Sequence, residues 1–157
     1  MKKCFLAAFF FIFFPVINTG ASVAVHVIET GLPEGRAVNQ HTEQWENAFM
    51  DVLFESGFIV SNAPILRIET KPAGDIFQTL LYGSAEMKNW GLDFILVIQL
   101  DYSADPRFPS EISFIIYKVS TGERIHEARV EGRLYGSTRD EYNSIRTIAG
   151  GLVPYLR

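Results

Sequence analysis

Three histidines are the side chains of this sequence that could bind a metal ion or exchange a proton near neutral pH. His26, His41 and His126 stand far apart, and the metal-binding pattern H-E-x-x-H is absent. His126 is expected to be a core or rim histidine of a strand. His26 would approach it only if their two strands were neighbours, and His41 is expected in solvent before the first helix. We therefore predict no metal-binding residue and no cofactor.

Asp101 and Asp105 flank the residues Tyr-Ser-Ala and are the carboxylates whose spacing could serve a hydrolase. Two acids on either side of a glycosidic bond can act as acid and base or as acid and nucleophile. The plainer interpretation is a loop whose acids cap turns and face water. The Gly-Ser pairs in YGSAEM and YGSTRD lack the G-x-S-x-G pattern of a serine nucleophile. No catalytic residue is predicted.

The loop DPRFP, Asp105–Pro109, is the best candidate for contact with a partner protein. Arg107 and Phe108 stand between prolines, which limit the entropy lost on binding. Arginine and aromatic side chains carry a large share of interface energy. The alternative is a proline-braced turn in which Phe108 folds onto the sheet. GLPEGR, residues 31–36, is a second candidate loop, and it lacks the Lys-Ser/Thr of a phosphate-binding loop.

The first 21 residues are typical of an export signal. Lys2 and Lys3 precede the apolar run Cys4–Ile17, and Thr19 and Ala21 occupy the −3 and −1 positions of a cleavage site. The run is shorter than the ~20 residues that cross a bilayer, although an uncleaved anchor is the alternative. Cys4 stands at the start of the run and not just after its end, so it is not placed like the lipidated cysteine of a lipoprotein.

Cleavage would leave one domain, residues 22–157, with no cysteine and no membrane span. Export without disulfides suits a bacterial periplasm. Removing Lys2 and Lys3 from the 14 basic side chains leaves 12 against 18 acidic ones, a net charge of −6. This charge repels phosphate backbones and anionic membrane surfaces, and nucleic-acid binding is excluded on that basis.

The elements that position these residues follow from hydrophobic periodicity. Residues 22–28 alternate valines with other residues and predict a strand. A helix capped by Thr42 and ending before Gly57 is predicted from its apolar stripe, which comprises Trp45, Ala48, Phe49, Val52 and Leu53. Residues 58–61 and 65–68 read as extended, and residues 74–90 as a second helix.

The second half of the chain predicts a central strand and a hairpin. Residues 93–102 are almost continuously apolar, which indicates a strand buried on both faces. Residues 111–119 form the next strand, and Gly122 supplies the positive φ of the turn to its partner. In that partner Glu127, Arg129, Glu131 and Arg133 share one face, opposite His126, Ala128, Val130 and Leu134. The charged face is a solvated ladder rather than a site.

A last helix is predicted after the capping box Thr138–Glu141, with a bend near Gly150, Gly151 and Pro154. The order is β-α-β-α-β-β-β-α. We expect an α/β fold, on the borderline with α+β, in which a mixed sheet of four to five strands packs against three helices.

Several short phrases resemble a periplasmic α/β domain shared by three groups of proteins. These are the curli secretion-channel protein (CsgG), the amino-terminal domain of the Tol-system propeller protein, and lipoprotein activators of penicillin-binding proteins. The phrases are VAVHVI, SGFIVSNA, GLDFILVIQL and IIYKVSTGERI. The resemblance implies the fold and an envelope location. The chain lacks both the lipidated cysteine and the length for channel-forming hairpins, so a secretion pore is not expected.

Taken together, these features predict a non-enzymatic exported accessory or adaptor protein that contacts another envelope protein. Two alternatives remain open. One is a cell-wall hydrolase that uses Asp101 or Asp105, and the other is a carrier of a small ligand or lipid.

Overall fold

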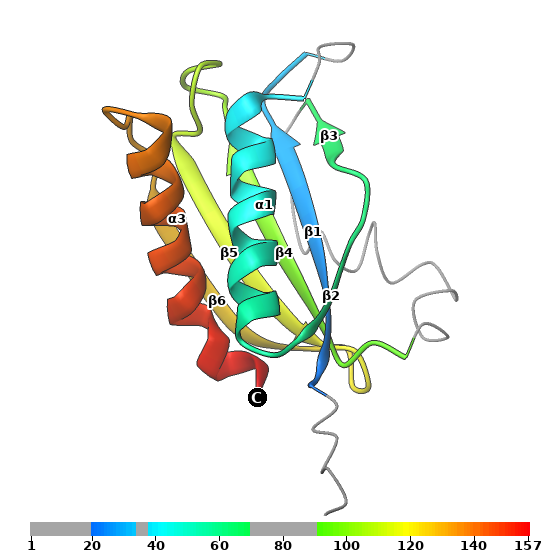
Figure 1. The fold of residues 1–157 in the computed structure, drawn as a ribbon. Helices are drawn as coiled ribbons and strands as arrows, with labels where there is room; N and C mark the ends of the chain where they lie inside the picture. Colours follow the sequence, from blue (N-terminus) through cyan, green and yellow to red (C-terminus); the bar gives the residue numbers. More distant parts are fainter. Residues whose placement is uncertain (1–19, 34–37, 70–90) are drawn as a thin grey trace, which may run out of the picture.

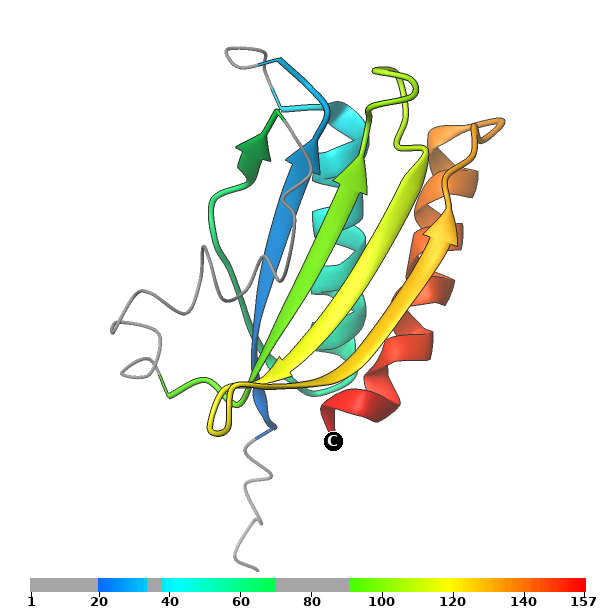
Figure 2. The same ribbon diagram turned by 180° about the vertical axis from the view of Figure 1, so that it is seen from behind.

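A computed structural model describes residues 20–33, 38–69 and 91–157. The predicted helix over residues 74–90 and nearly all of the predicted export signal lie outside these ranges. In the described part, helices α1 and α3 lie side by side on one face of a twisted sheet (Figures 1 and 2). This arrangement confirms the expected mixed α/β fold.

The described residues form six strands, two α-helices and a short 3-10 helix. These are β1 (Ser22–Thr30), α1 (Gln40–Glu55), β2 (Ile59–Asn62), β3 (Leu66–Ile68), β4 (Phe94–Asp101), β5 (Glu111–Lys118), β6 (Glu123–Glu131), α3 (Thr138–Leu152) and the 3-10 helix η2 (Val153–Leu156). None of the helices in these ranges is both long enough and apolar enough to cross a membrane.

The sheet has the strand order β2-β1-β4-β5-β6, and β3 also pairs with β1. β1 runs parallel to β2, β3 and β4, whereas β4, β5 and β6 form an antiparallel meander. The expected four to five strands are therefore six. β2 and β3 pair with successive parts of β1 on either side of Pro64, which has no N–H to donate to a ladder.

β4 is the central strand that its apolar sequence predicts. Its side chains are buried on both faces, with Leu96 and Ile98 toward the helices and Ile95 and Val97 on the second face. On the helical face, Phe114 of β5 packs against an aromatic cluster of α1, with Trp45 and Phe49 at centroid distances of 5.9 and 5.4 Å. This cluster forms the centre of the core.

The β5–β6 hairpin is confirmed. Gly122 has φ +71°, and β6 alternates as expected, with Glu127 and Arg129 on the face opposite His126 and Ala128. Ion pairs at 2.7 and 3.0 Å join Glu127 to Arg124 and Arg129. β6 ends at Glu131, so Arg133 and Leu134, which we predicted to continue the alternation, lie beyond the strand.

Both helices start earlier than the sequence suggested. The N-cap of α1 is Asn39, whose Oδ1 accepts from the backbone N–H of His41, so Thr42 lies inside the helix. The N-cap of α3 is Ser137, whose Oγ accepts from the N–H of Asp140. The capping pair is therefore Ser137 and Asp140. It lies one residue before the predicted pair, Thr138 and Glu141.

The predicted end of α1 is confirmed, and the late bend predicted for α3 is found at Pro154 but not at the two glycines. Gly57 follows α1 with φ +89°. α3 continues through Gly150 and Gly151 to Leu152, where the chain tightens into η2 around Pro154.

Candidate functional site

The carboxyl ends of β1, β3 and β4 and the amino-terminal ends of α1 and α3 meet at one end of the domain (Figure 1). In open α/β sheets this end is where ligands bind. Here it also holds buried polar side chains, which we call the carboxyl-end cluster: Glu29, Thr42, Tyr102 and Glu141.

Glu29 connects three elements. Its carboxylate accepts from Nε of Arg67 in β3 at 2.7 Å and from the backbone N–H of Asn39 at 3.0 Å. Asn39 in turn donates through Nδ2 to the carbonyl of Pro106 at 3.2 Å. The start of α1 is thus tied both to the sheet and to the loop after β4.

Glu141 joins the two helices. Its carboxylate oxygens lie 2.7 and 2.8 Å from Nδ1 of His41, and the residue is only 3% exposed. The expectation that His41 precedes the helix in solvent is therefore wrong. His41 lies in the first turn of α1 and is half-buried against α3, because the helix begins two residues before Thr42.

Tyr102 lies beneath these two helix starts, and its hydroxyl is 2.8 Å from Oγ1 of Thr42. Burial raises the pKa of the Tyr102 phenol, and the negative charges of Glu29 and Glu141 raise it further. The hydroxyl consequently stays protonated at physiological pH, so it can hydrogen-bond but cannot act as a base.

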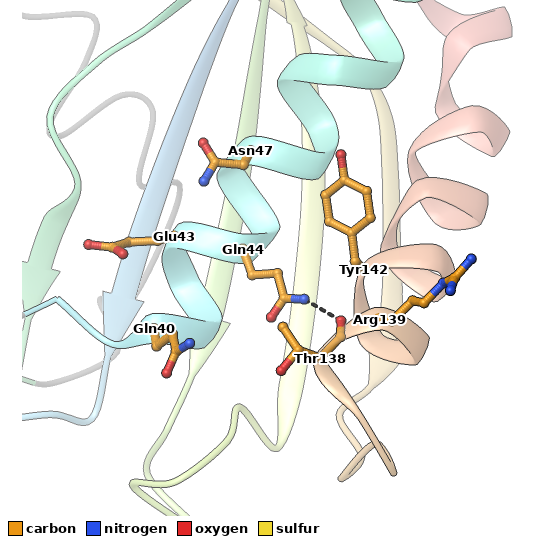
Figure 3. A pocket seen from close by; sticks show the side chains of 7 residues that line it. All are labelled: Gln40, Glu43, Gln44, Asn47, Thr138, Arg139 and Tyr142. Carbon is orange, nitrogen blue, oxygen red and sulfur yellow. Dashed lines mark hydrogen bonds between the residues drawn. The ribbon is translucent and has the colours of Figure 1, made fainter.

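An open groove of about 570 Å³ lies between the first turns of α1 and α3 (Figure 3). Nε2 of Gln44 donates to the Thr138 carbonyl at 2.5 Å and spans the groove. The Tyr142 hydroxyl, at its edge, donates to Asp51, and this bond raises the pKa of Tyr142. The lining is Gln40, Glu43, Gln44, Asn47, Thr138, Arg139 and Tyr142. Such amides and hydroxyls can bind a polar surface by hydrogen bonds.

The Asp105–Pro109 loop projects from the same end. Arg107 has a side chain that is 75% exposed, and its guanidinium binds the Asp105 carboxylate at 2.6 Å. The hydrogen bonds from the Arg107 side chain and backbone N–H lower the pKa of Asp105 to about 2. Phe108 is half-buried and Pro109 is buried. The loop therefore holds Arg107 outward while its two following residues pack inward.

Asp101 and Asp105 do not form an acid–base pair. Asp101 accepts from the backbone N–H of Ser103 at 2.9 Å and from its hydroxyl at 2.5 Å. A general acid needs a carboxyl pKa raised toward neutrality, whereas that of Asp105 is lowered. Both carboxylates are bound to groups of their own loop.

His26 and His126 are not neighbours. His26 pairs with Val97 in the register of β1 and β4 and points to the second face, where burial lowers its pKa. His126 lies in β6, which β4 and β5 separate from β1, and on the helical face it stacks on Tyr155 at a centroid distance of 3.6 Å. Among the described residues, no group of three or more His, Cys, Asp or Glu side chains could hold a metal ion.

Sequence reasoning missed the carboxyl-end cluster. Thr42 and Glu141 were assigned to helix caps, because T-x-x-E is a capping pattern and a threonine preceded the first apolar stripe. The signal that could have found the cluster is polar residues at the ends of buried strands, such as Glu29 after VAVHVI. Of the GLPEGR loop, residues 34–36 lie outside the described ranges.

A family model described as "Uncharacterised protein" matches residues 22–133. No curated protein matches the sequence. Solved structures do match, among them a PelC dodecamer from Paraburkholderia phytofirmans at 16% identity and a TM-score of 0.48. That match covers 90% of this chain and 91% of the PelC chain.

Two further structures are similar at lower identity. TolB from Acinetobacter baumannii has 12% identity and a TM-score of 0.48, and the match covers 87% of this chain but only 28% of TolB. A DUF330 protein from Xanthomonas campestris has 12% identity and a TM-score of 0.40, with 85% and 81% of the two chains covered. TolB is one of the three groups that the sequence resembles; the likeness to CsgG and to the penicillin-binding-protein activators stays a prediction.

Proposed function

This chain belongs to that family of uncharacterised proteins, and we propose that it is an exported, non-catalytic accessory protein that contacts another envelope protein through the Asp105–Pro109 loop. The main support for this proposal is the position of Arg107, whose side chain extends from the loop into solvent. Arg107 is exposed, yet its guanidinium is fixed by Asp105 and its loop is fixed by Asn39.

A fixed arginine loses little conformational entropy when it binds, which favours an interface role. The neighbouring loop adds an apolar side chain. Gly132 donates its N–H to the Ser110 carbonyl at 2.9 Å, and two residues later Leu134 is 62% exposed. A guanidinium and an apolar side chain at one end of the domain suit a protein surface that offers a carboxylate beside an apolar patch.

The hydrolase alternative has less support. Its two carboxylates are bound within their own loop, and the pKa of Asp105 is shifted in the direction opposite to that of a general acid.

The groove between α1 and α3 adjoins the carboxyl-end cluster, and a partner that contacts the Asp105–Pro109 loop could extend over this groove.

The test is site-specific photo-crosslinking in the native host, with the photoreactive residue at position 107, followed by affinity measurement with the purified partner. Arg107→Ala is expected to weaken that affinity. Arg124→Ala is the matched control, because Arg124 is also exposed and also paired with an acid, Glu127, but lies in the hairpin at the other end of the domain. Unchanged affinity of the Arg107→Ala/Phe108→Ala double variant would remove this loop as the contact surface.

A further inference from the structure

Strand β6 is the outermost strand on its side of the sheet (Figure 2). It pairs with β5 along one edge, and among the described residues no strand pairs with its other edge. None of its residues is buried. An open edge of this kind presents backbone N–H and C=O groups that can pair with a strand of another chain.

The hydrogen bonds to β5 identify the backbone groups on that open edge. The N–H of Gly132 donates to the Ser110 carbonyl, so it points toward β5. In an antiparallel pair the backbone groups of alternate residues point to the same side. The register with β5 is unbroken over residues 126–131, so the N–H and C=O groups of Glu127 and Arg129 point outward.

The charges on this edge are complementary to themselves in one register. Glu127 and Arg129 lie on the same face of β6, two residues apart, with side chains that are 32% and 61% exposed. Suppose that a second copy pairs antiparallel through its own β6, with Ala128 opposite Ala128. Each Glu127 then lies opposite the Arg129 of the other copy, and both positions form hydrogen-bonded pairs. Opposite charges directly across two strands stabilise their pairing.

The neighbouring registers are less favourable. A shift by one residue places either Glu127 or Arg129 opposite the same residue of the other copy, which brings like charges together. Centring the pair two residues earlier takes the ladder across the bulge of the hairpin. Centring it two residues later pairs only three residues of each strand, because β6 ends at Glu131. The small side chain of Ala128 suits the central position, where opposite Cα atoms approach to about 4.5 Å.

We propose that β6 joins two copies of this chain into a two-fold dimer, in which the two sheets continue as one through antiparallel pairing about Ala128. Two Glu127–Arg129 ion pairs between the copies fix the register. This contact is separate from the one proposed for the Asp105–Pro109 loop, and either can exist without the other. Charges and a bulge can also protect an edge strand against pairing, so the experiment must separate these two roles.

The experiment measures self-association by sedimentation of the protein purified from cells that express the full chain. Glu127→Arg and Arg129→Glu each convert both ion pairs into like-charge pairs, and each is expected to weaken the dimer on the order of tenfold. The double variant Glu127→Arg/Arg129→Glu is the matched control, because it keeps the composition and is expected to associate as the wild type does. An equimolar mixture of the two single variants is expected to form a heterodimer, in which every charge again meets its opposite.

A disulfide tests the register independently. Cys4→Ser removes the only cysteine of the chain. In that background Ala128→Cys is expected to link two copies under mild oxidation, because the Cα separation at the central pair lies within the range of a disulfide. Ser61→Cys is the control. Ser61 is exposed in β2, at the opposite edge of the sheet, and is expected to stay unlinked.

Three outcomes would overturn the proposal. A wild type that stays monomeric would mean that the charges and the bulge protect the edge. A dimer that both single variants leave unchanged, or a mixture that associates no better than its components, would exclude the ion pairs. Linkage at Ser61 rather than Ala128 would place the contact at the other edge. Circular dichroism checks that each variant is folded, and the Ala128→Cys result decides if a charge variant is not.

Discussion

Nδ1 of His41 in α1 lies 2.7 Å from a carboxylate oxygen of Glu141 in α3, although the two residues are 100 positions apart in the sequence. This contact is the first of four polar contacts between the helices. The others are Gln44 to the Thr138 carbonyl, Tyr142 to Asp51, and Arg146 to Glu55. The two helices that border the groove are thus fixed to each other by polar side chains above an apolar core.

His41→Ala is expected to destabilise the protein more than Glu141→Gln. The alanine variant leaves a buried carboxylate without its partner, at about 2 kcal/mol, whereas glutamine removes the charge and keeps a group that can hydrogen-bond to the imidazole. Urea unfolding at neutral pH measures the difference. The double variant completes a mutant cycle, and additive losses would contradict a direct interaction between the two side chains.

The fold could be predicted from the sequence better than the carboxyl-end cluster, because the sequence patterns that determine the fold are local. The stripe that includes Trp45 and Phe49, the alternation around Glu127 and the turn glycine Gly122 each act within one element. The pairing of His41 with Glu141 depends on how two helices pack, which no short pattern encodes. The split of β2 from β3 depends likewise on the register of both with β1.

Arg107→Ala is expected to return the pKa of Asp105 from about 2 toward 3.8, since hydrogen bonds from Arg107 are the main cause of the shift. The folded-state pKa is depressed, so this carboxylate contributes stability above pH 3.8 that is lost as the pH falls toward 2. Carboxyl-detected NMR titration of wild type and variant checks the shift. An Asp105 that titrates identically in both proteins would show that the loop is not held by this pair.

Because Tyr102 is buried, we expect the protein to lose stability at alkaline pH, where the phenol ionises. Its folded-state pKa is raised above the ordinary 10.0, so its contribution is complete below pH 10 and is lost as the pH rises further. Tyr102→Phe is expected to cost about 1 kcal/mol at neutral pH through the lost bond to Thr42, and to show a smaller decline above pH 10. Chemical unfolding of wild type and variant at neutral pH and above pH 10 measures both effects. Tyr155→Phe is the control, because it removes a hydroxyl from an exposed ring. A decline of equal size in the Tyr102→Phe protein would assign the alkaline loss to other groups.

Gly132→Ala tests whether the loops at the carboxyl end are held together by close backbone approach. A Cβ at Gly132 would lie 1.6 Å from the carbonyl oxygen of Pro109, which is backbone and cannot move aside alone. We expect a loss of about 3 kcal/mol in unfolding free energy, together with displaced amide NMR signals in the Asp105–Pro109 loop. Gly150→Ala is the matched control, because a Cβ there meets nothing within 4 Å, and a helical alanine should add up to about 1 kcal/mol. Equal stability of the two variants would mean that the two loops separate at no cost, and the loop would then not be the fixed surface that partner contact requires.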